Sequence, residues 1–237
     1  MSENKSGFLG TIIGMATSPR NVFSGIEEID LKKGIIVVLI IAALSGWAGM
    51  TYFTKTPLLF PGMGSGSGRP GGGSPLFSPG AQNSAGLDPA ALRSRLAPFI
   101  AIGGILGAVT RWIIPSILVL LVANIWVGKG SSKRMLAMTG FASAPRIIQQ
   151  LLRVIDAYTI SAADIASLTA TRASASGLLG KLVNQAFTVF NLFGVLTIVL
   201  TAVAVSVNYG ATPRKAVYVT VLAYVVYMIL RVFLPIV

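Results

Sequence analysis

The clearest pattern along the chain is a series of long apolar runs, which short basic connectors separate. Residues 34–53 form a run of twenty residues without a single charge. At 1.5 Å per residue, a helix of this length is about 30 Å long, which matches the hydrocarbon core of a bilayer. The runs are continuously apolar and do not alternate with a period of two, so we expect helices and not a barrel. The pattern therefore predicts an all-α, polytopic membrane protein.

Five stretches are long and apolar enough to be predicted as transmembrane helices. The second lies within a longer apolar stretch, 92–127, which Pro98 and Pro115 divide and Arg111 interrupts; we expect its helix to begin near the far interface and to bend near Pro115. Together the stretches form a helical membrane domain over residues 34–237. The predicted spans are residues 34–53, 107–127, 135–158, 182–209 and 216–237.

Residues 1–33 are predicted to be a cytosolic segment with short amphipathic helices. The second of these helices starts at Ser18-Pro19, where an N-cap residue precedes a proline at the first helical position. Two arrangements fit such helices: they lie in the plane of the headgroups, or they pack against the cytosolic ends of the spans. The apolar face of the first helix comprises Phe8, Leu9, Ile12, Ile13 and Ala16.

Between the first two spans, residues 56–91 have an unusual composition. Gly, Pro and Ser supply 20 of these 36 residues. Such a segment buries too little apolar surface to offset the entropy lost on ordering. We predict a disordered loop here.

The third predicted span carries a polar stripe. Its members fall within roughly 120° of helical arc at 100° per residue. A polar stripe on a membrane helix has to face protein, water or the interface. Either its outer members snorkel at the end of the helix, or the stripe lines a polar cavity that also involves Arg111 or Asn191. The stripe consists of Arg146, Gln149, Gln150, Arg153 and Asp156.

The distribution of basic residues predicts the orientation. With the N-terminus inside, the cytosolic connectors hold nine Lys and Arg residues, and the opposite side holds seven in longer connectors. Short, basic connectors favour the cytosol, so we predict a multi-pass protein of the cell membrane with a cytosolic N-terminus. Basic residues that flank the spans and meet anionic headgroups also explain the net charge of +12. We expect no nucleic-acid binding, because no basic run is interleaved with aromatic residues. The nine are Lys5, Arg20, Lys32, Lys33, Lys129, Lys133, Arg134, Arg214 and Lys215.

The inventory of reactive side chains argues against an enzyme. The chain has no histidine, no cysteine and only seven carboxylates. It therefore lacks thiol nucleophiles, the common zinc and haem ligands, and the usual acid–base residue. We predict no catalytic residues, no metal site and no cofactor.

Small residues in the first two spans allow helices to approach closely. They are Ser45, Gly46 and Gly49 in one span and the Gly103-x-x-x-Gly107 pattern in the other. Such residues serve helix contacts within one subunit or between subunits. We favour the contact within one subunit and keep a homo-oligomer as the alternative.

Several short motifs resemble those of the Yip (Ypt-interacting protein) family, in its archaeal and bacterial branch. The third span opens with Gly140, Phe141, Ala142 and Pro145, and the N-terminal segment contains Ser18-Pro19-Arg-Asn-Val-Phe23. The likeness extends over most of residues 9–234. It implies a five-helix membrane domain with a cytosolic N-terminus, and the family's eukaryotic members bind Rab-type GTPases. The Tyr-Gly-Pro element of those members has no counterpart here. The motif residues are Ser18, Pro19, Phe23, Gly140, Phe141 and Pro145.

These observations predict a non-enzymatic membrane scaffold or organiser. We expect it to engage cytosolic or membrane protein partners or anionic lipid through the N-terminal segment and the basic turns. The alternative is a small-solute or ion transporter or channel that uses the polar stripe.

Overall fold

The computed structural model describes residues 8–27, 30–56, 89–161, 163–165, 167 and 177–233. These residues form helices and no strand. Most of the predicted loop 56–91 lies outside the described residues. In chain order the helices are α1 (Phe8–Thr17), α2 (Pro19–Ser24), α3 (Leu31–Lys55), α4 (Pro89–Trp126), α5 (Ser132–Ala142), α6 (Pro145–Thr159), α8 (Leu178–Val189), α9 (Leu192–Tyr209) and α10 (Pro213–Phe233).

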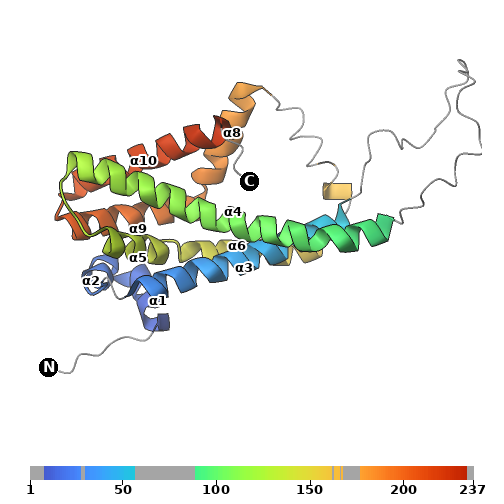
Figure 1. The fold of residues 1–237 in the computed structure, drawn as a ribbon, viewed down its shortest axis with the longest axis horizontal. Coiled ribbons are helices and arrows are strands. Elements are labelled where there is room, and N and C mark those ends of the chain that lie inside the picture. The colour runs from blue at the N-terminus through green and yellow to red at the C-terminus, as the bar shows by residue number, and fades with distance from the viewer. Residues whose placement is uncertain are drawn as a thin grey trace, which may run out of the picture.

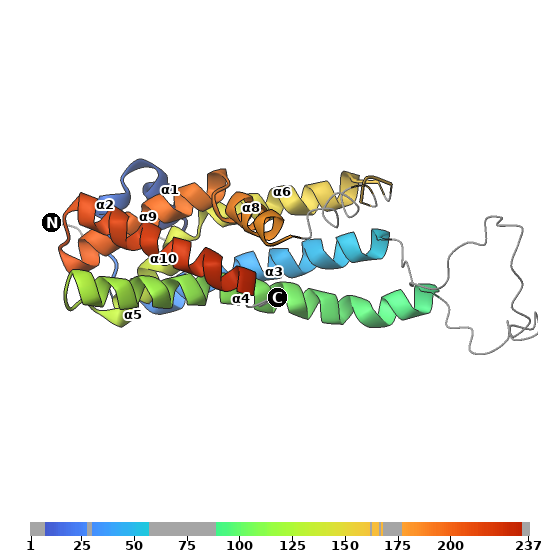
Figure 2. The same cartoon turned by 90° about the horizontal axis from the view of Figure 1, so that it is seen from above.

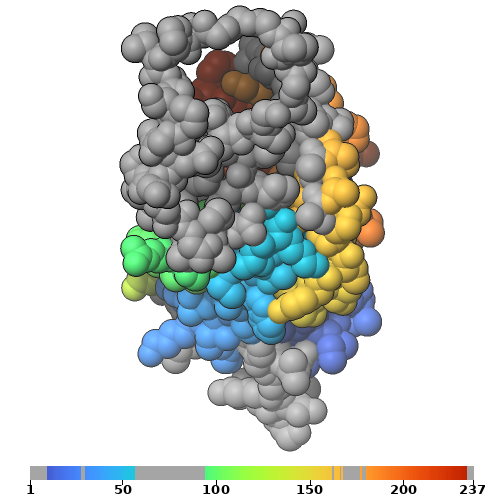
Figure 3. All heavy atoms as spheres, turned by 90° about the vertical axis from the view of Figure 1, so that its right-hand side faces the viewer, coloured from blue at the N-terminus to red at the C-terminus, as the bar shows by residue number. Residues whose placement is uncertain are grey.

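The long helices form an elongated bundle. Helix α3 packs against α4, α5 and α6, and α3 and α4 run along much of the length of the molecule (Figure 1). Helices α9 and α10 complete one half of the bundle, and α3, α4 and α6 extend past them at the other end (Figure 2). Seen from that end, α3 lies between α4 and α6 (Figure 3).

Among the described residues, four helices are long and apolar enough to cross a membrane: α3, α4 from Ser94 onward, α9 and α10. Large apolar side chains on their outer faces are exposed, including Ile125 at 77% and Leu192 at 69%. Because a water-soluble bundle would bury most of these side chains, the bundle uses lipid as its solvent. The prediction of an all-α membrane protein is confirmed.

The count of five spans is not confirmed, because the third predicted span, 135–158, is broken. Helix α5 ends at Ala142, and Pro145 begins α6 after a two-residue turn. Proline has no N–H to continue the ladder of hydrogen bonds, and it favours the first turn of a helix. At 11 and 15 residues, α5 and α6 are about 16 and 22 Å long, so neither crosses a bilayer core alone.

The fourth predicted span, 182–209, also divides in two. Helix α8 ends at Val189, and Asn191 caps α9 by accepting a hydrogen bond from the Gly194 N–H at 2.9 Å. In a continuous helix the Gly194 N–H would bond to a backbone carbonyl; here the Asn191 side chain takes that place. Of these two helices, only α9, about 27 Å long, is long and apolar enough to cross a membrane.

The other predicted spans differ at their ends. Helix α4 begins at Pro89, inside the predicted loop, and runs for 38 residues through Pro98 and Pro115 without ending at either proline. Helix α3 begins three residues earlier than predicted and α10 begins at Pro213. Residues 234–237 of the last predicted span lie outside the described residues.

Glycines set the closest helix contacts. A Cβ built on Gly140 of α5 would lie 2.7 Å from the Gly34 carbonyl oxygen of α3, and one on Gly104 of α4 would lie 2.9 Å from the Gly46 Cα. Real Cβ atoms do not approach backbone this closely, so these crossings need glycine. The predicted small residues Ser45 and Gly46 therefore serve the α3–α4 contact within one subunit. Gly103 has no described atom within 4 Å of a built Cβ, and it lines an open pocket with Gly49 and Tyr52 of α3.

Candidate functional site

The family-motif residues build one end of the bundle. Phe23 of α2 is completely buried, and Phe141 of α5 is 1% exposed. Gly140 lies at the crossing with α3, and Pro145 is the first residue of α6. Ser18 precedes α2 at the N-cap position, but its side chain makes no capping hydrogen bond there. These residues determine how the N-terminal segment and α5 pack, and they do not form a reactive group.

The N-terminal segment is held against the bundle by Arg134. Its Nε donates to the Ile26 carbonyl at 2.7 Å, and its Nη2 donates to the Ser24 carbonyl at 3.1 Å. Phe23, Ile26 and Met15 of the segment all belong to the hydrophobic core. Of the two predicted arrangements, the structure has the segment packed against the ends of the spans. Ile13 of the predicted apolar face points outward at 67% exposure.

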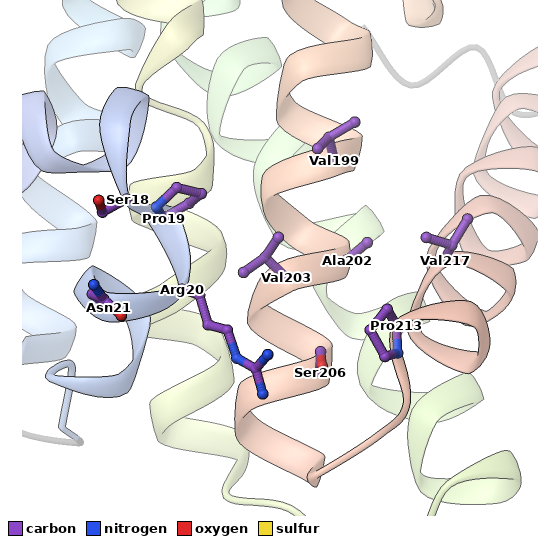
Figure 4. Close-up of a pocket in the computed structure, with 10 residues that line it drawn as sticks. All are labelled: Ser18, Pro19, Arg20, Asn21, Val199, Ala202, Val203, Ser206, Pro213 and Val217. Atoms are coloured by element: carbon purple, nitrogen blue, oxygen red, sulfur yellow. The ribbon is translucent and has the colours of Figure 1, made fainter.

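A groove of about 400 Å³ lies between α2, α9 and α10 (Figure 4). The turn before α2, with Ser18 and Pro19, forms one wall, and Val203 and Val217 form part of the opposite side. The Arg20 side chain reaches from α2 along α9 toward Ser206. The groove therefore combines an apolar interior with a cation at its edge.

The same end of the molecule is strongly basic. Its connectors and helix starts carry eight Lys and Arg residues, against Glu27 and Asp30 among the described residues. Asp30 accepts from Lys33 Nζ at 2.7 Å, which neutralises one of the eight. We call this region the basic end; it comprises Arg20, Lys32, Lys33, Lys129, Lys133, Arg134, Arg214 and Lys215.

The polar stripe of α6 faces a cavity of about 340 Å³ inside the bundle. We call it the arginine cavity, because Arg111 of α4, Arg146 and Arg153 of α6, and Arg231 of α10 line it. The α6 amides Gln149 and Gln150 contribute further polar surface, and so do Asn184, Gln185 and Asn191 of α8 and the start of α9. Polar groups from α4, α6, α8, α10 and the start of α9 therefore line one cavity, and α3 contributes only the apolar Ile41.

Polar groups in the arginine cavity lack partners. Within the described part of the chain, its four arginines make no ion pair and no carboxylate lines the cavity. Arg111 Nε, Gln150 Oε1 and Gln185 Oε1 are buried without a hydrogen-bond partner. Buried polar groups are normally satisfied, so the cavity is poised for a ligand or water.

Asp156 is the one stripe residue that does not line the arginine cavity. Its carboxylate accepts a hydrogen bond from the Tyr52 hydroxyl of α3, and it lines an adjoining pocket with Gln149 and Arg153. Beside it, Lys55 Nζ donates to the Tyr158 carbonyl at 2.7 Å. Asp156 thus serves to fasten the end of α6 to α3.

Arg231 and Gln185 were missed by the sequence analysis. Arg231 is the only charged residue of α10 after its first turn, which could have marked it as a candidate for the stripe's partner. Gln185 gave no such signal. Among the described residues, no group of three His, Cys, Asp or Glu side chains is placed to hold a metal ion.

The comparisons with known proteins cover these same elements. The Yip1 domain matches residues 13–234, which include every motif residue named above. No curated protein and no solved structure matches the chain. The match confirms the resemblance drawn from the short motifs. Since it extends over most of the chain, the protein belongs to the Yip1 domain family and is an integral membrane protein of the Yip type.

Proposed function

We propose that the protein is a non-enzymatic membrane scaffold of the cell membrane. Its basic end lies in the cytosol, where it engages anionic lipid, and its N-terminal segment presents a surface to protein partners. The observation that carries the proposal is the concentration of eight cations around the segment that Arg134 fastens to the bundle. Short basic connectors favour the cytosolic side, and each Lys or Arg near an anionic surface contributes about 1 kcal/mol.

The fastened N-terminal segment supports a scaffold role. With Phe23 and Ile26 buried, α2 has a fixed position, and Arg20, Asn21 and Ser24 remain exposed. A rigid, preformed surface loses less entropy on binding a partner than a flexible one. The absence of His and Cys from the chain is the reason for proposing no catalysis.

The lipid part of the proposal can be measured with one tryptophan. Trp126 ends α4 near the basic end and is 60% exposed. In a variant with Trp47→Phe and Trp112→Phe, brominated phosphatidylglycerol should quench Trp126 more strongly than brominated phosphatidylcholine. High salt should reduce the difference, because screening weakens surface electrostatics.

Matched charge variants locate the effect. A triple variant, Lys133→Gln with Arg214→Gln and Lys215→Gln, removes three charges from the basic end. It should reduce the free-energy preference for the anionic lipid by up to about 3 kcal/mol, at about 1 kcal/mol per charge. Lys55→Gln with Arg95→Gln removes charge from the opposite end of α3 and α4 and should leave the preference unchanged. Equal quenching by both lipids in the parent protein would contradict the proposal.

A small-solute or ion transporter is the second candidate, and the arginine cavity is the observation that motivates it. Reconstituted vesicles loaded with an anion should then release it at a rate that depends on Arg111. A release rate equal to that of protein-free vesicles would remove this candidate and leave the scaffold proposal in place.

A further inference from the structure

We propose that the arginine cavity is a binding site for a phosphate-type oxyanion that also carries a hydroxyl group. Such a ligand is either hydrogen phosphate from solution or the phosphodiester headgroup of a lipid such as phosphatidylglycerol. The site lies away from the basic end, so this inference does not depend on the scaffold proposal.

The charge of the cavity requires an anion. Four guanidinium groups from three helices line one volume of about 340 Å³, and no described lining residue carries a negative charge. Arginine does not deprotonate in proteins, so the four side chains cannot reduce the repulsion among them by losing protons. A bound anion would neutralise the cluster where it is least exposed, because nearby like charges at low dielectric strongly repel one another.

The hydrogen-bonding groups select the kind of anion. Guanidinium forks match the geometry of phosphate oxygens, and Arg111 Nε is a buried donor without a partner. Gln150 is only 6% exposed, and its Oε1 is a buried acceptor without a partner. A halide cannot donate a hydrogen bond to that oxygen, whereas a hydroxyl of hydrogen phosphate or of a glycerol headgroup can.

The start of α9 adds to the positive potential. Asn191 and Gly194, at the N-terminus of this 18-residue helix, both line the cavity. The N-terminal end of a helix carries partial positive charge, which favours phosphate, and the Gly194 N–H itself is already bonded to Asn191 Oδ1. The arginines and the N-terminal end of α9 therefore both favour a bound anion.

The position of the cavity along the helices allows a ligand to come either from the lipid headgroups or from water. Arg111 lies fifteen residues before the end of α4, about 22 Å along the helix from the basic end. Arg231 lies eighteen residues after the start of α10, about 27 Å along. In a hydrocarbon core of about 30 Å, these positions are near the opposite interface, within reach of headgroups and of water.

Binding can be tested on the full-length protein in phosphatidylcholine nanodiscs. One arm measures binding of radiolabelled inorganic phosphate by equilibrium dialysis. The other arm titrates phosphatidylglycerol into the nanodiscs and counts the lipids retained by native mass spectrometry. The variants are Arg111→Gln and Arg231→Gln, with Arg95→Gln as control, because it removes the same charge from an exposed position on α4.

We expect saturable binding in at least one arm, weakened about tenfold or more by Arg111→Gln and by Arg231→Gln, but unchanged by Arg95→Gln. Arg111→Lys keeps the charge without the fork, and it should weaken binding less. In the absence of the anion, the midpoint temperature of thermal unfolding of Arg111→Gln should equal or exceed that of the parent protein, because the variant lacks one of the four mutually repelling charges. A purely structural role of Arg111 predicts a lower midpoint instead.

The two arms identify the source of the ligand. Retention of phosphatidylglycerol without phosphate binding assigns the site to a lipid headgroup, and the reverse assigns it to a dissolved anion. The proposal is overturned if neither probe binds saturably, or if the arginine variants bind like the Arg95→Gln control.

Discussion

The crossing of α3 and α5 gives the sharpest prediction about stability. At Gly140, a Cβ would lie 2.7 Å from the Gly34 carbonyl oxygen and 2.8 Å from its carbonyl carbon. Ordinary contact starts at 3.4 Å, so the two backbones have to separate by about 0.7 Å to admit Gly140→Ala. Neither backbone can turn away as a flexible side chain could.

The magnitude follows from two opposing terms. Overpacking of a tight contact costs about 1–3 kcal/mol, whereas replacing glycine by alanine inside a helix gains about 1 kcal/mol. Gly103→Ala in α4 is the matched control, since its Cβ meets nothing within 4 Å and only the helix term applies. The difference between the two variants should therefore be about 1–3 kcal/mol, with Gly140→Ala the less stable.

The assay is reversible unfolding in mixed micelles, followed by tryptophan fluorescence as the denaturing detergent increases. The free energy of unfolding should fall for Gly140→Ala relative to Gly103→Ala. If the two variants unfold at the same detergent fraction, the α3–α5 crossing is not as close as described, and the explanation of the Gly140 motif position is wrong.

Three further variants test other contacts. Phe23→Ala empties a completely buried site and should lower the free energy of unfolding in micelles by about 3–5 kcal/mol; a loss under 1 kcal/mol would contradict the docked position of α2. The hydrogen bond of 2.9 Å between Ser116 Oγ and Thr139 Oγ1 should give a coupling of about 0.6 kcal/mol in a double-mutant cycle of Ser116→Ala with Thr139→Val, and zero coupling would argue against it. Gly103→Leu should reduce self-association in crosslinking experiments if this glycine contacts a second copy, and an unchanged monomer fraction would leave the small residues with their role inside one subunit.

The membrane class and most helix positions could be predicted from the sequence because they depend on local properties. A run such as 34–53 is apolar over a bilayer's thickness whatever it packs against, and α3 contains it entirely. The prediction of a continuous third span is not confirmed, because hydropathy does not register a break at Ser143–Ala144, where Pro145 starts a new helix. A proline in the sequence does not by itself mark the end of a helix, since α4 continues through Pro98 and Pro115.

The candidate site was predictable only in part. The stripe on α6 is visible as a helical periodicity, and its facing residue Arg111 stood out as a charge in an apolar run. Arg231 stood out as a lone charge in an apolar helix, but the sequence did not show that it and α8 face the stripe, because this depends on how helices distant in sequence come together around the cavity. The position of Asp156 near the end of the helix could be read from the sequence, but its hydrogen bond with Tyr52 of α3 could not.

The orientation of the basic end is the central claim about function, and cysteine labelling in intact cells tests it most directly. The chain has no cysteine, so single cysteines report without background. Thr212→Cys lies exposed at the basic end, and Ala163→Cys lies exposed beyond α6 at the other end. A membrane-impermeant maleimide should label Ala163→Cys in intact cells and label Thr212→Cys only after the cells are permeabilised. Labelling of Thr212→Cys in intact cells would place the basic end outside and contradict the account.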